Sequence, residues 1–431
     1  MKNNDALQQQ LFAELHNRPF PLLGPPVSIS HIVMLDPGDH GHEIAHICDL
    51  AEKYSVPPPP GLASCYYQNF GEFEFRWERH TEFSSYIVIV PNAGATPFCE
   101  TAISLLPGEW LDNIPGTHFG GDHIELRPAQ GLTPTAQSLH PFFEGQKLIG
   151  SKVLEGSATL WTALRNHSDG YSRILVYTDR LDICDCGRLV RSLIELSAYR
   201  NLTLLALPIA RDLIPVVSKL EYLLADLTER LTEIGSFADE KQLLEELSAC
   251  AAQLEKLISE NNFRFAATEA YYSLTEDRLL ELAEESLPNL RTLSQFYHRR
   301  FRPGFSTCQS IRSRMDNLSV RVNRSAGLLR TRVDLALEAQ NQSLLRSMDR
   351  RAMLQLRMQQ TVEGLSIIAM THYSLSLLGH LLAGIPSHVL PLEADTLVAM
   401  VTPVVFLGAW LSIRSIRKKF QQADETAAET P

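Results

Sequence analysis

The chain of 431 residues contains only seven cysteines, and neither glycine, with 23 residues, nor proline, with 24, is enriched. An odd number of cysteines in so long a chain indicates reduced thiols in the cytosol and not a disulfide framework. The ordinary glycine and proline content excludes collagen-like and low-complexity chains. Basic residues number 39 against 50 acidic ones. This balance argues against nucleic acid as a partner, because domains that bind nucleic acid are usually basic.

Common phosphate-binding and nucleophile motifs are missing too. No segment matches the patterns G-x-x-x-x-G-K-[ST], G-x-G-x-x-G or G-x-S-x-G, so we expect no bound cofactor and no enzymatic activity. The first ten residues have no apolar core behind their charge and do not form a secretory signal, which predicts a cytosolic N-terminus. What the chain does have is a 45% share of hydrophobic residues, enough for two or more structural units.

Two apolar runs near the C-terminus predict a transmembrane helical hairpin over residues 362–413. Residues 362–384 contain Glu363 as their only carboxylate and, as a helix, would cover about 30 Å of hydrocarbon. Residues 396–413 form a shorter run without carboxylates, which can return across the bilayer. Two buried helices of a soluble core are the alternative, but such helices rarely run this long without charge.

The residues flanking both runs predict the orientation of this hairpin. Cytoplasmic ends collect Lys and Arg, and the basic flanks are Arg350, Arg351, Arg357, Arg414, Arg417, Lys418 and Lys419. The connecting segment, residues 385–395, holds Glu393 and Asp395 but no Lys or Arg. We therefore expect a membrane protein with both termini in the cytoplasm, ending in a basic and then disordered tail over residues 414–431.

Residues 1–180 alternate short apolar runs with turn signals, which predicts an α+β domain in the cytosol. A helix is expected over residues 40–54. In one predicted strand Phe73, Phe75 and Trp77 alternate with charged residues, which places the rings on one face. The other expected strands span residues 27–35, 86–90, 117–126, 147–154, 158–164 and 172–177.

From residue 183 the apolar spacing becomes helical. Residues 183–303 predict several antiparallel helices, with breaks at Pro208 and Pro215 and separate helices over 240–260, 263–285 and 290–301. Pro303 and Gly304 are expected to end the last of these. Residues 304–361 then predict one long stalk helix, whose apolar residues keep a near-heptad rhythm: Ile311, Met315, Leu318, Val322, Leu329, Val333, Ala336, Leu344 and Met348.

The stalk also differs in charge from the helices before it. Residues 310–360 contain ten Arg and four acidic residues, whereas residues 221–285 contain sixteen acidic and five basic residues. Opposite charges on antiparallel helices favour their pairing, although two independently solvated faces are the other explanation. The heptad rhythm predicts a homo-oligomer assembled through the stalk.

One string suggests metal chemistry. His42, Glu43 and His46 match the pattern H-E-x-x-H, in which two imidazoles one helical turn apart bind zinc and the glutamate activates water. The pattern is short and no further ligand stands at a family-type spacing. An ordinary amphipathic helix is therefore the main interpretation, a zinc hydrolase is the outsider, and no catalytic, cofactor or metal residue is assigned.

Polar residues inside the first predicted span are a second candidate site. Titratable groups in hydrocarbon are costly unless they face a partner or water. They suggest a packed interface between spans or the lining of a pore. The residues concerned are Ser366, His372, Tyr373, Ser374 and His380.

Several strings resemble a bacterial family known as domain of unknown function 3422, described as membrane-anchored proteins. They lie at residues 16–20 (HNRPF), 75–83 (FRWERHTEF), 169–173 (DGYSR), 329–333 (LRTRV), 337–341 (LEAQN) and 360–366 (QTVEGLS). The resemblance covers nearly the whole chain. It implies an anchor in the bacterial inner membrane but no activity and no catalytic residue.

The order of the predicted parts is also similar to that of the CorA-type magnesium channels, which are homopentamers. That similarity implies an oligomer with the first span lining a pore. The Gly-Met-Asn filter of those channels is absent, since residues 379–386 read GHLLAGIP. The leading hypothesis is therefore a membrane-anchored protein, in contact with the lipid bilayer, whose cytosolic part assembles with itself or docks an unidentified protein. An ion channel is the alternative.

Overall fold

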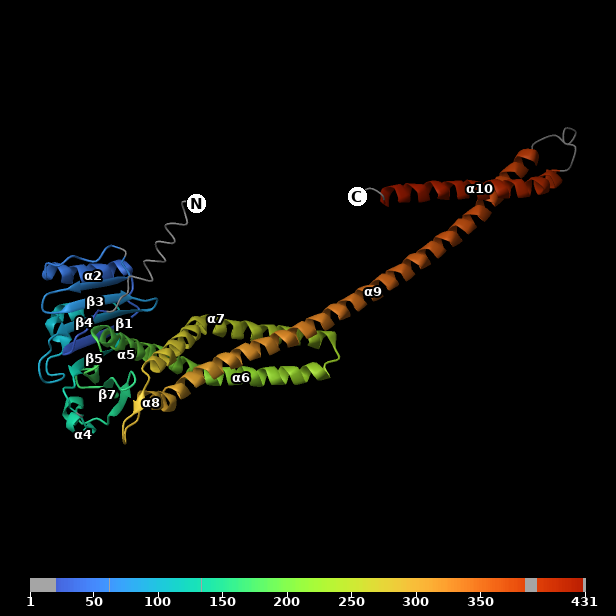
Figure 1. Cartoon of the computed structure of the whole chain (residues 1–431). Helices are drawn as coiled ribbons and strands as arrows, with labels where there is room; N and C mark the ends of the chain where they lie inside the picture. The colour runs from blue at the N-terminus through green and yellow to red at the C-terminus, as the bar shows by residue number, and fades with distance from the viewer. Residues whose placement is uncertain (1–20, 62, 133, 384–393, 429–431) are drawn as a thin grey trace. The chain divides into compact units, whose positions relative to one another are not determined.

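The computed structural model describes residues 21–61, 63–132, 134–383 and 394–428 (Figure 1). The chain divides into two compact units: residues 1–234 with 242–327, and residues 235–241 with 328–431. The string at residues 16–20 and most of the expected outer loop, including Glu393, lie outside the described residues.

The first unit contains a mixed nine-stranded sheet in the order β2-β3-β4-β1-β5-β8-β7-β6-β9. Its strands are β1 (Val27–Leu35), β2 (Cys65–Asn69), β3 (Glu74–Arg79), β4 (Phe83–Pro91), β5 (Thr117–Pro128), β6 (Ile149–Val153), β7 (Ala158–Asn166), β8 (Ser172–Thr178) and β9 (Glu285–Ser286). The pairing of β5 with β8 is parallel, and the other described pairs are antiparallel. The predicted α+β domain is confirmed, and β1 has the expected bounds.

Helices cover both faces of this sheet (Figure 1). Helix α2 (His40–Lys53) packs on one face through Ile47 and Leu50, which join the aromatic rings Phe75 and Trp77 in one core. The rings of Phe75 and Trp77 in β3 therefore lie on one face of the sheet, as the alternation in the sequence predicts. Helix α5 (Ile183–Thr203) covers the other face with a leucine-rich side. Short helical turns lie in the loops: η1 (Ala102–Leu105), α3 (Gly108–Asp112), α4 (Ala136–Leu139) and η2 (His140–Phe143).

The helical region that follows is confirmed, with different breaks. It consists of α6 (Ala206–Glu233), α7 (Phe237–Glu281), α8 (Leu293–Arg300) and α9 (Arg302–Ala383). Pro215 lies inside α6, where the buried neighbours Leu213 and Val217 hold the helix despite the lost hydrogen bond. Pro303 lies in the first turn of α9, a position where a missing N–H costs nothing. Residues 240–285, expected as two helices, belong almost entirely to α7.

The residues in the first half of the heptad seam are buried within the chain. Ile311, Met315, Leu318 and Val322 are at most 2% exposed. Arg314 pairs with Glu221 of α6 at 2.7 Å and Arg312 with Glu269 of α7 at 2.6 Å. In the second unit Arg332 pairs with Glu240 at 2.6 Å. The charge contrast between these helices therefore produces real ion pairs, which align α9 on its neighbours.

The second half of the seam has no such cover. Leu344 is 53% and Met348 64% exposed. Leu318, in contrast, is buried, so the same heptad rhythm continues from a buried part of α9 into an exposed part. Helix α10 (Ala394–Ala428) completes the second unit and continues through most of the tail that the sequence predicts as disordered.

Two helical segments of the described chain are long and apolar enough to cross a membrane. Residues 183–233 are partly buried, and Leu189 and Leu193 of α5 lie in the core of the sheet, as in a soluble core helix. Residues 396–415, with a mean hydropathy of 2.0, have no buried residue and coincide with the second predicted span. Residues 362–383, the end of α9, are not among the two segments.

We expect Leu318→Ala to lower the free energy of unfolding by about 3 kcal/mol, because it removes a buried side chain and leaves a cavity. The matched control is Val320→Ala in the same helix, which should change stability little because Val320 is 58% exposed. Urea unfolding followed by fluorescence of the four tryptophans would measure both. Equal losses in the two variants would contradict the packing of α9 described above.

Candidate functional site

The H-E-x-x-H string lies on α2, and its glutamate faces the sheet. Glu43 is fully buried and accepts hydrogen bonds from Trp77 Nε1 at 3.2 Å and Tyr86 Oη at 2.9 Å. It also pairs with Arg79. Burial and the Glu43 charge raise the pKa of Tyr86. Glu43 therefore anchors α2 to the sheet, and this arrangement leaves its carboxylate no access to a metal-bound water.

The two histidines of the string lie apart from that carboxylate. His42 is exposed, whereas the His46 ring stacks on Trp110 with centroids 4.4 Å apart. Burial lowers the pKa of His46. Across the described part of the chain no group of three or more His, Cys, Asp or Glu side chains is arranged to hold a metal ion.

The polar residues of the first predicted span all lie on α9. Ser366, His372, Tyr373, Ser374 and His380 are exposed in the described chain. Ser366 Oγ donates to the Val362 carbonyl at 2.8 Å, and His380 Nδ1 donates to the Ser376 carbonyl at 2.7 Å. These contacts are local to the helix and satisfy a donor of each side chain.

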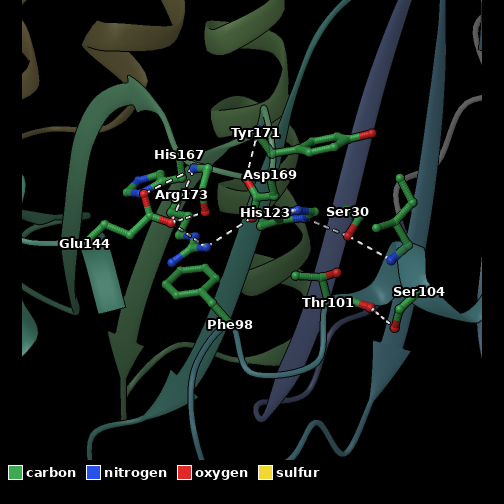
Figure 2. Close-up of polar contacts among 12 residues, drawn as sticks. Ser30, Phe98, Thr101, Ser104, His123, Glu144, His167, Asp169, Tyr171 and Arg173 are labelled. Atoms are coloured by element: carbon green, nitrogen blue, oxygen red, sulfur yellow. Dashed lines mark hydrogen bonds and ion pairs between the residues drawn. The ribbon is translucent and has the colours of Figure 1, made fainter. Parts of the chain in front are cut away.

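A group of buried polar residues that the sequence does not single out occupies the centre of the sheet. His123 of β5 lies on the face opposite α5 (Figure 2). Its Nδ1 is 2.9 Å from Ser30 Oγ, which itself accepts from the Ile103 amide at 3.0 Å. On the other side of the ring, His123 Nε2 lies 3.8 Å from Asp169. Burial lowers the pKa of His123 to about 4, so the ring is neutral at pH 7.

Arg173 of β8 extends this group toward the loops (Figure 2). Its guanidinium donates to Asp169 at 3.0 Å and to the Phe142 carbonyl at 2.8 Å, and lies 5.4 Å from the centre of the Phe98 ring. Glu144 lies 3.5 Å from both Arg173 and the buried His167. Burial, together with the charge of Arg173, lowers the pKa of His167. These contacts fasten two loops to the sheet, which is a structural role.

The α5 face carries a second buried group around Asp122. This carboxylate accepts from Ser197 Oγ of α5 at 2.8 Å and from Ser172 Oγ of β8. His31 lies 3.5 Å from it through Nδ1 and 2.9 Å from Ser85 Oγ through Nε2. Burial opposes the ionisation of Asp122, but the contacts with His31 and Ser172 outweigh it and hold the pKa below its usual value.

The order Ser85, His31, Asp122 is that of the nucleophile, base and acid in serine hydrolases. A hydrolytic serine must reach its substrate. Ser85 is only 4% exposed and lies within β4, paired with Val33 and Glu78 on the neighbouring strands. The three residues therefore form a buried row of polar side chains across the sheet and not a catalytic triad.

A cavity of about 390 Å³ lies next to Asp122, and we call it the β5–β8 cavity. Ser172 and Ser197 belong both to its wall and to the hydrogen-bond set of Asp122. Its other lining residues are Phe119, Gly120, Gly121, Leu164, Arg165, Asn166, Arg200, Asn201 and Phe296. Within the string 169–173, Asp169 and Arg173 point to one face of the sheet and Ser172 points to the other. This string therefore contributes to both the polar group around His123 and the polar group around Asp122.

The stability of the fold should depend on pH through His123. Because the folded-state pKa, about 4, lies below the ordinary value of 6.5, the unfolded chain takes up the proton first as the pH falls. The free energy of unfolding should fall between pH 6.5 and pH 4 by up to about 3 kcal/mol from this group, and no further below pH 4.

Urea titrations at several pH values would measure this dependence. His123→Asn should be less stable at pH 7 and should show a shallower pH dependence in this window, while His46 and His167, whose pKa values burial also lowers, keep their contributions. An unchanged pH profile in His123→Asn would contradict the assignment.

A family model described as Protein of unknown function (DUF3422) matches residues 3–420. Comparison with curated protein sequences and with solved structures gives no match.

Proposed function

We propose that this chain, which belongs to the family of the Protein of unknown function (DUF3422), is a membrane anchor that holds its sheet-containing unit in the cytoplasm at the bacterial inner membrane. The observation that carries the proposal is the segment 396–415. Its 20 residues have a mean hydropathy of 2.0, and none of them is buried by the described chain. A helix of that length spans about 30 Å, the thickness of the hydrocarbon core.

The end of α9 supplies the outgoing leg of the hairpin. Over residues 362–383 the helix is continuous, and Glu363 lies at its edge. Large apolar side chains in this stretch are exposed: Val362, Leu365, Ile368, Met370, Tyr373, Leu377 and Leu381. Each of these side chains gains about 1.5–3 kcal/mol when it leaves water. Lipid provides that environment around the whole helix, which a soluble fold does not.

The ends of the two legs favour an orientation with both termini inside. Arg350, Arg351 and Arg357 precede the first leg, and Arg414 follows the second. The Arg414 guanidinium lies 5.0 Å from the centre of the Trp410 ring. Trp and Arg together are typical of the interface between lipid and water, and basic residues remain on the cytoplasmic side.

The polar groups on the first leg support helix packing more than ion conduction. The hydrogen bonds of Ser366 and His380 to carbonyls one turn earlier satisfy a polar donor within the helix. Such residues can face another helix at low cost. Nothing in the described chain favours the channel alternative.

The protein should sediment with membranes after lysis and resist extraction by alkaline carbonate. Deletion of residues 396–431 should release most of it from the carbonate-washed membrane, because a single leg of marginal apolarity anchors it poorly. A reporter fused after Pro431 should be active only in the cytoplasm. A full-length protein in the soluble fraction, or a periplasmic signal from the reporter, would refute the anchor or its orientation respectively.

We further propose that a second copy of this chain covers the middle of α9. Confinement of both copies to one membrane brings their stalks parallel and close. Large apolar residues of this stretch are exposed: Leu335, Leu337, Leu344, Leu345, Met348, Met353, Leu354, Leu356 and Met358. Among them, Leu344 and Met348 continue the heptad seam beyond the part that is buried within the chain.

Light scattering of the detergent-solubilised protein should give a mass of two or more chains. The double variant Leu344→Glu and Met348→Glu should reduce it to one chain, because two carboxylates would then face the seam. Gln342→Glu, an exposed polar position of the same stretch, is the control and should leave the mass unchanged. A strictly monomeric wild-type protein would refute the assembly.

A further inference from the structure

Two register shifts in the sheet lie next to the β5–β8 cavity, and residues at both shifts line it. In the pairing of β1 with β5, Val33 faces Gly120 and Met34 faces His118, which leaves Phe119 unpaired. In the pairing of β7 with β8, the register shifts between Thr162 and Asn166. Phe119 and the shifted residues Leu164 and Arg165 all line the cavity. Bulges commonly redirect side chains next to functional sites, and here two of them serve one cavity.

The cavity wall offers hydrogen-bond donors with positive charge. Arg165 is exposed at the wall, and within the described residues it makes no hydrogen bond or ion pair. Arg200 donates through Nε to Asn201 Oδ1 at 3.1 Å. Since Oδ1 is occupied, the Nδ2 group of Asn201 remains to donate. It lies 3.6 Å from the position that a Cβ atom on Gly120 would take, so the missing side chain of Gly120 keeps this space open.

The two serines of the wall present acceptors. Ser172 and Ser197 each donate their hydroxyl proton to Asp122, so the oxygen lone pairs are what they can offer to a ligand. Asp122 supplies one negative charge behind this wall, against the two guanidinium groups of Arg165 and Arg200. The cavity therefore suits a ligand that is anionic at one end and carries hydroxyl groups at the other.

We propose that the β5–β8 cavity binds a small phosphorylated molecule with free hydroxyl groups. Guanidinium groups bind phosphate oxygens in a bidentate geometry, and Arg165 is free to do so. Phe119, Leu164 and Phe296 give the apolar wall that ligand sites of this size usually have. The phosphate can belong to a soluble metabolite or to a phospholipid headgroup. The site does not depend on the membrane anchor, because all its residues belong to the first unit.

The test uses the full-length protein in a neutral detergent and a phosphate-free buffer, with inorganic phosphate, glycerol 3-phosphate and phosphatidic acid as probes. Glycerol 3-phosphate should raise the melting temperature in a saturable manner, whereas potassium chloride at equal ionic strength should not. Arg165→Gln should weaken binding about tenfold or more, because one charge-assisted contact is lost. Arg165→Lys should retain part of the affinity. Arg324→Gln is the matched control, since Arg324 is equally exposed and forms no described contact.

The outcomes separate the source of the phosphate. Saturation by glycerol 3-phosphate supports a soluble ligand, and saturation by phosphatidic acid alone supports a lipid headgroup. No saturable effect of any probe on the wild type, or equal binding by Arg165→Gln and Arg324→Gln, would overturn the proposal. Carbonate extraction of Arg165→Gln should remain that of the wild type, so a failure of this site is distinguishable from a failure of the anchor.

Discussion

The centre of the sheet depends on one buried carboxylate. Asp122 lies on a strand that is covered by helix α5, and an ionised group there is stable only because hydroxyls and a histidine surround it. Its partners come from separate elements: Ser172 from β8, Ser197 from α5 and His31 from β1. The carboxylate therefore fixes the pairing of three strands with each other and with the covering helix. A shift of one residue in any of these strands would turn its polar group to the opposite face.

The same constraint explains why polar residues occur in strands that otherwise read as apolar. His31 lies 3.5 Å from Asp122 on one face, and His123, one residue further along β5, bonds to Ser30 on the other. Helix α5 covers the group around Asp122, and a loop covers the group around His123. Beside Asp122, the missing side chain of Gly120 leaves room in the cavity next to Asn201. A Cβ on Gly121 would come within 2.3 Å of the His31 carbonyl, so the close approach of β1 and β5 requires glycine there.

Local patterns in the sequence predict the elements well where one face is uniformly apolar. Strand β1 and the alternation of Phe75 and Trp77 follow from side-chain spacing alone. Strand β2 is missed because its residues 65–69 (CYYQN) are largely polar and lie at the edge of the sheet. The break at Pro215 is overestimated because a well-packed helix tolerates proline. The break near Pro303 exists, since α8 ends at Arg300, but Pro303 lies within the first turn of α9 and not before it. The site escapes prediction for another reason. Its contacts join residues far apart, such as His31 with Ser85, and no short motif records them.

Helix α9 shows how one periodic pattern can meet three surroundings in succession. Around Leu318 its apolar face is buried against the chain's own helices, and the charged pairs of Arg312 and Arg314 set that register. Around Met348 the same spacing continues without cover, although arginines keep this stretch compatible with water. Beyond Glu363 the charges end and apolar residues surround the helix. Spacing alone does not separate these stretches, because a heptad rhythm is the same whether the residues are buried, as Leu318 is, or exposed, as Met348 is. The distribution of charge adds a distinction, since residues 310–360 contain ten arginines whereas residues 364–383 contain none.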